Sequence, residues 1–441
     1  MSNVNQPRII PRQDHPVSRS RISEQALKVL YRLKKESFEA YLVGGGVRDM
    51  LLGAQPKDFD VATDALPDEV RGIFSNCRLI GRRFRLAHIH FGREIIEVAT
   101  FRGSHDTQEG DVDAQLDETG RILRDNVYGS IEEDVLRRDF TVNALYYNIR
   151  DFAIYDYVGG MGDLERKVLR LIGDPHTRYR EDPVRMLRAV RFAAKLDFTI
   201  DEHTEQGIFD LAASLRDISS ARLFDECLKL LMSGQAVATF RLLRHYGLFA
   251  HLFPGTEAVL QSEGPDGPTM TLLNRAFQNT DERIAQGKPV TPAFLFAALL
   301  WGPVRDAATA GVEQGLPVAV ALQQAAASVV DAQLKHVSLP KRFRAPMFEI
   351  WHLQSRFERR HGKRVWQLMA KPRFRASYDF LLLRAEAGEV EGELAEWWTR
   401  FQDADRDEQD RMLAASNGGS KPRKRRRRRR PARSVSPAAD E

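Results

Sequence analysis

A stretch near the N-terminus, residues 41–63, constrains the fold and chemistry of this chain more than any other: YLVGGGVRDMLLGAQPKDFDVAT. An apolar strand runs into three glycines, a short helix and a turn follow, and a second strand contains Asp58 and Asp60. Alternate residues of a strand point to the same side, so we expect both carboxylates on one face of a sheet. Glycines at a helix start, here Gly44 and Gly45, offer backbone N–H groups to an anion. The stretch therefore predicts a phosphate-binding turn beside two acids.

The two aspartates predict a metal site. Like charges side by side on a strand repel each other, and they are tolerated best where a cation lies between them. Asp58 and Asp60 could together hold two Mg2+ ions about 3.5–4 Å apart, one activating an attacking hydroxyl and the other stabilising the leaving oxygens. The alternative for an isolated D-x-D is an exposed strand with two solvated acids. The neighbouring glycine turn favours the metal site, and we expect metal-dependent nucleotide chemistry.

Positive charge is concentrated at the C-terminus. The net charge of the 441 residues is only +5, yet residues 421–433, KPRKRRRRRRPAR, contain ten basic groups and no acid. Such a run is expected to bind RNA phosphates without sequence preference, through counterion release. The alternatives are a solubilising charge run and contact with an acidic membrane surface. The residues predicted to bind RNA are Lys421, Arg423, Lys424, Arg425, Arg426, Arg427, Arg428, Arg429 and Arg430.

The pattern of apolar residues predicts an α+β fold with a small head and an all-helical neck, body and tail. With 43% hydrophobic residues, the chain can bury the cores of two or three domains. We predict a flexible N-terminal arm over residues 1–20, a catalytic head with a mixed β-sheet over 21–173, a helical neck and RNA-binding region over 174–260, a helical body and tail over 261–415, and a disordered Arg-rich tail over 416–441. A long polar loop in the head, 103–130, is expected to form a lid over the nucleotide.

Cysteine usage and hydropathy indicate the compartment. Cys77 and Cys227 are far apart and have no metal-like spacing, which is typical of a reducing compartment. The N-terminal residues lack the apolar core of a signal peptide. The longest apolar run, residues 293–301, is about half of the ~20 residues needed to span a bilayer. We expect a cytoplasmic protein without stable membrane insertion.

A second candidate segment follows the polar loop. Ser130 and Glu133 form a capping box, which predicts a helix that continues to about residue 147. Within it, the motif RRDFTVNAL places Asp139 and Asn143 four residues apart, on one helix face. A carboxylate beside an amide suits a ribose hydroxyl or a base edge. The alternative is a surface helix with an Asp–Arg ion pair.

A third segment, predicted as one helix over residues 176–195, is rich in acids and arginines. Glu181, Arg185 and Arg188 are spaced to form one stripe, with Asp182 beside it. Arginine donates and aspartate accepts hydrogen bonds in fixed geometry, so such a stripe can template a purine edge. The alternative is a solvated, salt-bridged helix face.

One further acid and two histidines lie on strands predicted after the aspartates. Glu97, between apolar neighbours, is either a third carboxylate that reaches the same metal pair or a glutamate at the rim of the sheet. His88 and His90 share a strand face. Without a third ligand nearby, we interpret both histidines as structural rather than zinc-binding.

Together these segments resemble the class II nucleotidyltransferases, the family of bacterial poly(A) polymerases and tRNA CCA-adding enzymes. Four motifs occur in order over about residues 40–260: LVGGGVRD with DFDVAT, RRDFTVNAL, YDYVGGMGDL and EDPVRMLRAVRF. Each motif is weak by itself, but their order and spacing are highly specific. The resemblance implies a nucleotidyltransferase head followed by helical domains, with ATP as substrate and a two-metal Mg2+ site.

The resemblance also implies roles for residues at the matching positions. Asp58 and Asp60 are expected to bind Mg2+ and to be catalytic, with Asp139 favoured as the third catalytic residue and Glu97 as its alternative. The RRD segment would contact ribose and phosphate, and the EDxxR segment would select the base. The residues expected to bind nucleotide are Gly44, Gly45, Arg48, Arg138, Asn143, Asp182, Arg185 and Arg188.

Two features favour the bacterial poly(A) polymerase branch of this family. Residues 79–89, LIGRRFRLAHI, and the arginine-rich C-terminal extension both look like that branch. The resemblance implies template-independent transfer of AMP from ATP to RNA 3′ ends with release of pyrophosphate, which promotes RNA processing and decay. The resemblance also implies RNA-decay proteins as partners. The alternatives are a tRNA CCA-adding enzyme and a non-catalytic RNA-binding protein with the same fold.

Overall fold

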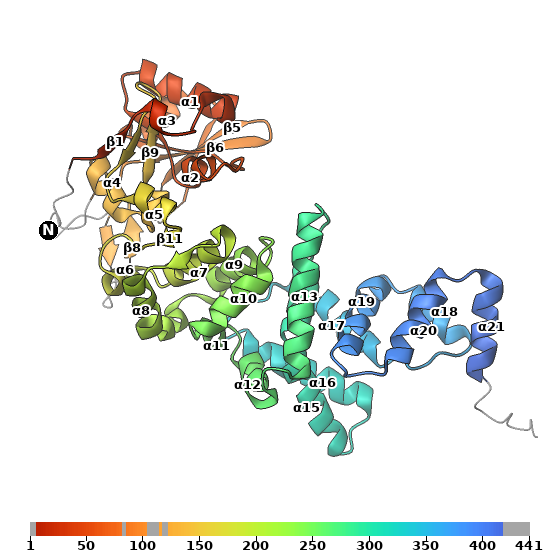
Figure 1. The fold of residues 1–441 in the computed structure, drawn as a ribbon. Helices are drawn as coiled ribbons and strands as arrows, with labels where there is room; N and C mark the ends of the chain where they lie inside the picture. Colours follow the sequence, from red (N-terminus) through yellow and green to blue (C-terminus); the bar gives the residue numbers. More distant parts are fainter. Residues whose placement is uncertain (1–5, 82–84, 104–113, 117–121, 418–441) are drawn as a thin grey trace, which may run out of the picture. The chain divides into compact units, whose positions relative to one another are not determined.

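The computed structural model describes residues 6–81, 85–103, 114–116 and 122–417. The chain forms two compact units, Met1–Met347 and Phe348–Glu441 (Figure 1). The unit boundary falls inside the range predicted as helical body and tail, 261–415. The basic run predicted to bind RNA, residues 421–430, lies outside the described residues.

The head is built on an eight-stranded mixed sheet, which confirms the predicted α+β class. Its strands lie in the order β1 (Arg8–Ile10), β10 (Ile154–Asp156), β9 (Leu145–Asn148), β2 (Ala40–Val43), β3 (Asp60–Thr63), β6 (Glu94–Thr100), β5 (Leu86–Phe91) and β4 (Cys77–Ile80). Strands β3 and β6 are parallel, and the other neighbouring pairs are antiparallel. The crossover that a parallel pair requires is supplied by α3 (Pro67–Ile73) and the β4–β5 hairpin.

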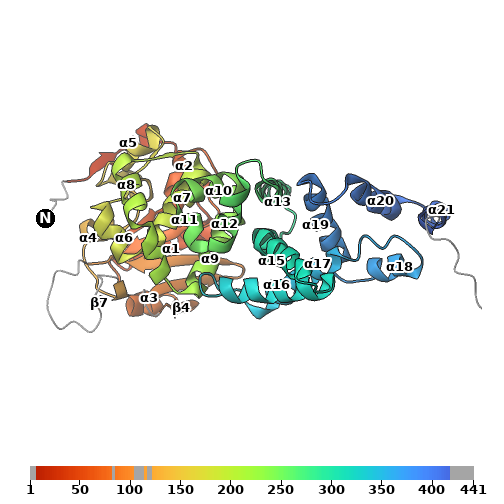
Figure 2. The ribbon, with the colours of Figure 1, turned by 90° about the horizontal axis from the view of Figure 1, so that it is seen from below.

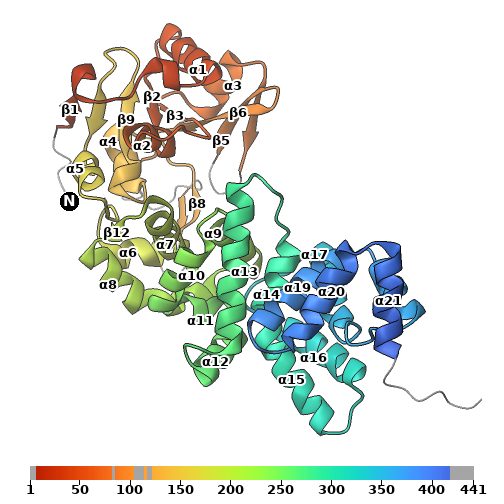
Figure 3. The same cartoon turned by 45° about the vertical axis from the view of Figure 1, so that its right-hand side comes forward.

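One face of the sheet forms the main core of the head. Helices α1 (Glu24–Lys35), α2 (Gly45–Leu51) and α3 pack against this face, and α1 and α3 lie side by side there (Figure 3). Leu42 and Val61, which are paired directly across β2 and β3, point into this core. Because three helices cover this face, a functional site on the sheet must lie on the other face.

The opposite face combines an apolar part with a polar part. Helix α4 (Ile131–Arg137) covers its apolar part, around Val43 and Tyr146. On β3 and β6 the same face carries Asp60 and Glu97 in place of apolar residues. The candidate site therefore lies on the second face, beside α4.

The predicted flexible N-terminal arm, residues 1–20, is wrong for the part that the structure describes. Strand β1 pairs with β10 at the edge of the sheet. Ile10 and Val17 are buried in the main core, and Nε2 of His15 lies 3.0 Å from the carbonyl oxygen of Phe152. The segment is ordered because its few apolar side chains complete a core formed by residues far along the chain.

The helix predicted over residues 130–147 ends much earlier than expected. After α4, Arg138 is extended, and a 3-10 turn, η3 (Thr141–Asn143), leads into β9. Tyr146 and Tyr147 are both buried, one on each face of the sheet. Aromatic residues fit a central strand well, and this packing prevails over the helical pattern.

The helix predicted over residues 176–195 is two helices. Helix α6 (Pro175–Glu181) ends before Asp182, which is extended, and α7 (Val184–Leu196) begins after Pro183. Proline lacks an N–H group and excludes the helical conformation from the residue before it. Glu181 and Arg188 therefore do not belong to one continuous helix, which corrects the predicted stripe.

The rest of the chain is helical, as predicted. The further helices are α5 (Gly160–Glu165), α8 (Glu202–Leu211), α9 (Ser220–Leu231), α10 (Ala236–His245), α11 (Leu248–Leu252), α12 (Pro254–Glu263), α13 (Pro268–Ala285), α14 (Pro292–Leu299), α15 (Trp301–Glu313), α16 (Val318–Gln333), α17 (Lys341–Gln354), α18 (Lys363–Met369), α19 (Phe374–Glu386), α20 (Gly392–Asp403) and α21 (Arg406–Asn417). In the first unit, α7 and α10 lie side by side (Figure 2). Among the described residues, no helix combines the length and the apolar character needed to cross a membrane.

Two minor sheets complete the first unit. Strands β11 (Val168–Leu169) and β12 (Thr199–Ile200) pair in parallel, and β7 (Ala114–Leu116) pairs with β8 (Ile122–Asp125) inside the predicted 103–130 loop. Residues 104–113 and 117–121 of that loop lie outside the described part. Its function as a lid stays a prediction.

The motif YDYVGGMGDL braces the turn that carries Asp139. The carboxylate of Asp156 accepts hydrogen bonds from the backbone N–H groups of residues 158–161, at 2.9–3.2 Å. This holds α5 against η3, where Oγ1 of Thr141 donates to Asp163 at 2.8 Å. Gly160 is so near Thr141 that any side chain on it would overlap the Thr141 carbonyl oxygen. The brace requires glycine at this position.

We expect Gly160→Ala to destabilise the head by about 1–3 kcal/mol, since the new methyl group forces α5 away from Thr141. Gly162→Ala is the matched control on the same helix, because its methyl group meets only the mobile end of Arg166. Alanine also favours a helix over glycine, so this control is expected to be neutral or stabilising. Thermal unfolding of the full chain measures both. Equal melting temperatures for the two variants would contradict the brace.

Candidate active site

Polar residues from neighbouring strands meet in one row on the second face of the sheet. Backbone pairing places Asp60 beside Glu97, and Glu97 beside His88. On the other side of Asp60, the row continues through Val43 to Tyr146. Directly opposed residues on one face of a sheet hold their side chains within contact range. The row therefore joins two acids, an imidazole and a phenol on one surface.

The glycine turn lies against the first of these acids. Gly44 has a φ of +76°, a backbone conformation that favours glycine, and a Cβ on it would lie 3.5 Å from Oδ2 of Asp60. Asp58 is exposed and precedes β3, so the strand begins two residues later than predicted. The structure nevertheless brings the glycine turn and Asp60 together at the start of β3.

The surroundings of Asp60 disfavour its negative charge. Burial is the largest cause and the Glu97 carboxylate is the next; with a smaller contribution from Asp58, they outweigh Arg138 and raise the pKa of Asp60 to about 6. Three carboxylates thus repel one another at the edge of one strand pair. A cation between them would relieve this repulsion.

A cavity of about 220 Å³ opens beside Asp60 and Glu97. The other residues that line it are Val43, Val61, Leu86, Ala99, Arg102, Asp134, Arg137 and Arg138. Carboxylates and guanidinium groups therefore surround one space. A site of mixed charge suits a ligand that combines phosphates with a metal ion, and it differs from a purely apolar pocket.

Arg138 is held in place by a buried triad. Its guanidinium donates to Oδ2 of Asp134 at 2.9 and 3.0 Å, and the Tyr146 hydroxyl donates to the same oxygen at 2.6 Å. Burial alone would raise the pKa of Asp134, but the charge of Arg138 and the bond from Tyr146 lower it overall. Asp134, which the sequence analysis did not select, thus sets the orientation of a residue predicted to bind nucleotide.

Asp139 is fully engaged with its neighbours. Its Oδ1 accepts from Nδ2 of Asn143 at 3.1 Å and from the Phe140 backbone at 2.8 Å. Its Oδ2 pairs with the guanidinium of Arg188. Burial alone would raise the pKa of Asp139, yet the charge of Arg188 and these hydrogen bonds hold it at about 2. Asp139 and Asn143 therefore meet as expected, although the predicted helix that would join them is absent.

Arg48 connects this turn to the glycine helix. Its side chain is only 2% exposed, and NH1 donates to Oδ1 of Asn143 at 2.6 Å. NH2 and Nε both bind Oδ1 of Asp49, at 2.6 and 2.9 Å. A continuous chain of contacts thus runs from Arg48 on α2 through Asn143 and Asp139 to Arg188 on α7.

Three guanidinium groups surround one aromatic ring on α7. The centres of the Arg48, Arg188 and Arg191 guanidiniums lie 5.1, 5.2 and 4.9 Å from the ring of Phe192. Nε of Arg191 is buried without a hydrogen-bond partner, and burial followed by the charge of Arg188 lowers the pKa of Arg191. This crowding of cations suits an anion such as a triphosphate.

Arg191 and Phe192 were not among the predicted binding residues. The signal for Arg191 is present in the sequence, because Arg185, Arg188 and Arg191 recur at every third position. That spacing continues one face of the helix. Phe192 lies four residues after Arg188 and shares its helix face. Its contact with Arg48, however, depends on how α2 and α7 pack.

The residues predicted to select the base are each held by a charged partner. Arg185 donates to Oε2 of Glu181 at 2.8 Å and to the carbonyl of Arg178 at 2.7 Å. Asp182 lies after the end of α6 and accepts from Arg222 on α9 at 2.8 Å. Because of the break between α6 and α7, Asp182 and Arg185 do not lie on one helix. Contacts with neighbouring helices hold each of the two side chains in place.

Arg178 joins the segment that was predicted to select the base to the head. One of its nitrogens donates to the carbonyl oxygens of Arg137 and Arg138, at 2.8 Å each. Another pairs with Glu181 at 2.5 Å. Burial, followed by the charge of Arg185, lowers the pKa of Arg178 to about 10. The sequence analysis missed this residue, because its partners are backbone atoms of a distant segment.

The acidic residues of the row fit a divalent cation of the hard type. Carboxylate oxygens are the ligands that Mg2+ prefers, and it commonly takes only one or two of them together with substrate phosphates. Within the described ranges, no three His, Cys, Asp or Glu side chains already stand in the arrangement of a metal centre. The acids around Asp60 therefore offer an open site rather than a closed cage.

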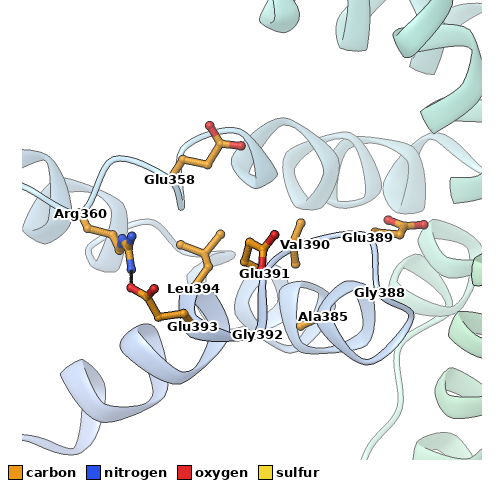
Figure 4. Close-up of a pocket in the computed structure, with 10 residues that line it drawn as sticks. All are labelled: Glu358, Arg360, Ala385, Gly388, Glu389, Val390, Glu391, Gly392, Glu393 and Leu394. Carbon is orange, nitrogen blue, oxygen red and sulfur yellow. Dashed lines mark hydrogen bonds and ion pairs between the residues drawn. The ribbon is translucent and has the colours of Figure 1, made fainter.

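A larger cavity, about 690 Å³, lies in the second unit between the residues after α17 and the turn from α19 to α20 (Figure 4). Glutamates dominate its lining, but Glu393 pairs with Arg360 at 2.9 Å and Glu389 pairs with Arg384 at 3.0 Å. None of the predicted site residues within the described part lines it. We therefore assign the candidate active site to the cavity in the head.

Comparisons with known protein families match most of the chain. The family model described as "Poly A polymerase head domain" matches residues 40–170. "Probable RNA and SrmB- binding site of polymerase A" matches residues 197–260, and "Polymerase A arginine-rich C-terminus" matches residues 314–432. These matches confirm the family resemblance seen in the sequence motifs.

Individual relatives give the same result. Poly(A) polymerase I of Salmonella typhimurium is 53% identical over 412 residues, which cover 92% of this chain and 88% of that protein. The CCA-adding enzyme of Geobacillus kaustophilus is 38% identical, over 54% of this chain and 56% of that protein. The solved structure of a tRNA-processing enzyme in its apo form I shares the fold with a TM-score of 0.61, at 22% identity over 90% of this chain and 97% of that one.

We expect Asp60→Asn to stabilise the metal-free protein while abolishing its chemistry. The pKa of Asp60 rises from 3.8 to about 6 on folding, so its charge disfavours the folded state above pH 6. The gain from the substitution is of the order of 3 kcal/mol at pH 7 and above. It disappears as the pH falls from about 6 towards 4, where the wild-type carboxyl is protonated.

Thermal unfolding at several pH values measures this effect. Asp225→Asn, at an exposed position in the middle of α9, is the control and is expected to leave the melting temperature unchanged. Adding Mg2+ is expected to stabilise the wild type more than Asp60→Asn. A lower melting temperature for Asp60→Asn at pH 8 without metal would contradict the repulsion described here.

Proposed function

The chain belongs to the family of bacterial poly(A) polymerase I, and from that membership we propose the reaction that its head performs. It transfers AMP from ATP to the 3′ hydroxyl of RNA, without a template, and releases pyrophosphate. The observation that carries this proposal is the row of crowded carboxylates around Asp60, beside a cavity lined by arginines. In the cell, such tailing would promote RNA processing and decay.

Residues of the head and of α7 would each contribute to the reaction. The RNA 3′ oxygen attacks the α-phosphorus of ATP, and the bond from that phosphorus to the β-phosphate oxygen breaks. Asp58 and Asp60 would hold Mg2+, which when bound lowers the pKa of the attacking hydroxyl and neutralises charge on the triphosphate. Gly44 and Gly45 would present backbone N–H groups to the phosphates. Arg48 and Arg188 would add positive charge next to them.

Two residues compete for the role of third acid. Glu97 stands beside Asp60 in the sheet and lines the same cavity, which supports it as the carboxylate that completes the metal site. The catalytic role predicted for Asp139 stays a prediction. Its carboxylate is occupied by Arg188 and Asn143, an arrangement that supports the positioning of these two side chains against ribose and phosphate.

Base selection is proposed for the segment that follows the head. Arg185 and Asp182 carry the donors and acceptors that a base edge requires. Arg138 and Asn143 belong to the head, where ribose would bind. Their partners Glu181 and Arg222 restrict both side chains. Side chains restricted in this way suit one base better than two, which favours ATP alone over alternating CTP and ATP.

The nucleotide preference tests the proposed function. With an unstructured RNA primer, we expect long tails from ATP and about 100-fold less incorporation from CTP. Asp58→Ala combined with Asp60→Ala is expected to reduce the rate at least 1000-fold while RNA binding persists. Efficient CTP addition to tRNA ends would instead support a CCA-adding enzyme. A wild type without turnover, but with normal RNA affinity, would support a non-catalytic RNA-binding protein.

The basic tail is proposed to bind RNA through phosphates. Ending the chain after Ser416 removes residues 421–430, and we expect weaker RNA affinity and a flatter dependence of log K on log salt. Ending it after Arg430 is the matched control, because it keeps that basic run. Filter binding at several salt concentrations measures both slopes. An unchanged slope after the first truncation would contradict phosphate binding by the tail.

Partners and compartment complete the proposal. The match of residues 197–260 to a model whose description mentions RNA and SrmB supports contacts of the neck with RNA and with a protein of that kind. Contact with RNA-decay proteins stays a prediction. RNA substrates occur in the cytoplasm of bacteria, and the wide separation of the two cysteines fits a reducing compartment. We therefore place the reaction in the cytoplasm.

A further inference from the structure

His88 stands next to Glu97, the acid that borders Asp60. Its Nε2 atom lies 3.2 Å from Oε1 of Glu97, and the two residues are paired directly across strands β5 and β6. The His88 side chain is 16% exposed and the Glu97 side chain 48% exposed. A largely covered histidine thus faces a half-exposed glutamate, whose side chain has room to rotate.

The contact between these side chains is close but not yet a hydrogen bond. Nε2 of His88 is buried and has no hydrogen-bond partner of acceptable geometry, although the Glu97 oxygen is within ion-pair distance. A buried donor without a partner costs free energy, which a small rotation of Glu97 would recover. Glu97 is the acceptor at hand, because it is directly opposed in the sheet.

The strand holds His88 firmly on the site face. Its neighbours Ala87 and Ile89 are buried in the main core on the other face of the sheet. Exchanging the two faces would expose both of these apolar side chains and would shift the pairing with β6. The imidazole therefore cannot leave the side of the sheet on which Asp60 and Glu97 lie.

We propose that His88 is a positioning residue, which donates a hydrogen bond from Nε2 to Glu97 and holds that carboxylate towards Asp60 and the metal. This inference rests on the proposed function, in which Glu97 completes the metal site. Carboxylates that ligate a metal are themselves held by hydrogen bonds from the surrounding shell, and removing such a bond weakens metal affinity. His88 acts through Glu97 and is not itself a ligand.

His90 provides a matched comparison within the same strand. It lies two residues further along on the same face, with its ring centre 6.3 Å from that of His88. Its cross-strand partner is Ile95 rather than an acid. Both histidines were interpreted as structural from the sequence, and the register separates them.

The experiment measures Mn2+ binding to the full chain by electron paramagnetic resonance, without RNA or nucleotide. We expect His88→Ala to raise the Kd for Mn2+ about 10-fold. His88→Gln places an amide N–H close to the position of Nε2, and we expect it to recover most of the affinity. His90→Ala is expected to stay within about twofold of the wild type. Melting temperatures show whether each variant is folded.

The outcomes separate this inference from the proposed function. Glu97→Gln is expected to weaken Mn2+ binding at least as much as His88→Ala does. If Glu97→Gln has no effect, the role of Glu97 in the proposed function fails. If Glu97→Gln weakens Mn2+ binding but His88→Ala keeps the wild-type affinity, the inference about His88 alone is overturned. It is also overturned if a folded His88→Gln variant binds Mn2+ no better than His88→Ala. Tighter binding by His88→Ala would overturn it as well.

Discussion

The ion pair between Asp139 and Arg188 is the interaction on which the site depends. Asp139 is buried, and an unpaired charge at such a position costs about 3–5 kcal/mol. Its partner lies on α7, beyond the head, so the pair ties the head to the helix that follows it. The same carboxylate holds Asn143, which in turn accepts from Arg48 on the glycine helix. This charge pair thereby holds the glycine turn and the segment that was predicted to select the base in one arrangement.

Opposite charges are kept on different elements of this site. Carboxylates gather where β3 meets β6, and guanidinium groups gather around Phe192 on α7. Like charges repel within each cluster. In the acidic cluster this helps to raise the pKa of Asp60, and in the basic cluster it helps to lower the pKa of Arg191. A nucleotide with its metal carries both signs of charge, so its binding would relieve both repulsions at once.

Local patterns predicted several contacts for partly wrong reasons. Asp139 and Asn143 were expected to meet on a helix, and they meet across a turn braced by Gly160 instead. The helix failed because buried tyrosines favour a strand, a choice made by the sheet rather than by the segment. Pro183 is a sequence signal for the break before α7, although one continuous helix was predicted there. The burial of Ile10 and Val17 could not be predicted from the neighbouring sequence, because the core that they enter is formed by distant residues.

The sequence by itself determined the chemistry available to this protein: the glycine turn, the D-x-D pair, the arginine-rich segments and the α+β division follow from residue type and short-range spacing. Only the tertiary structure decided which acid stands beside Asp60 and which histidine stands beside that acid. Glu97 and His88 owe their places to the register of β3, β6 and β5. A slip of one residue would turn them to the other face, and that register depends on packing along the whole sheet, which no local pattern contains.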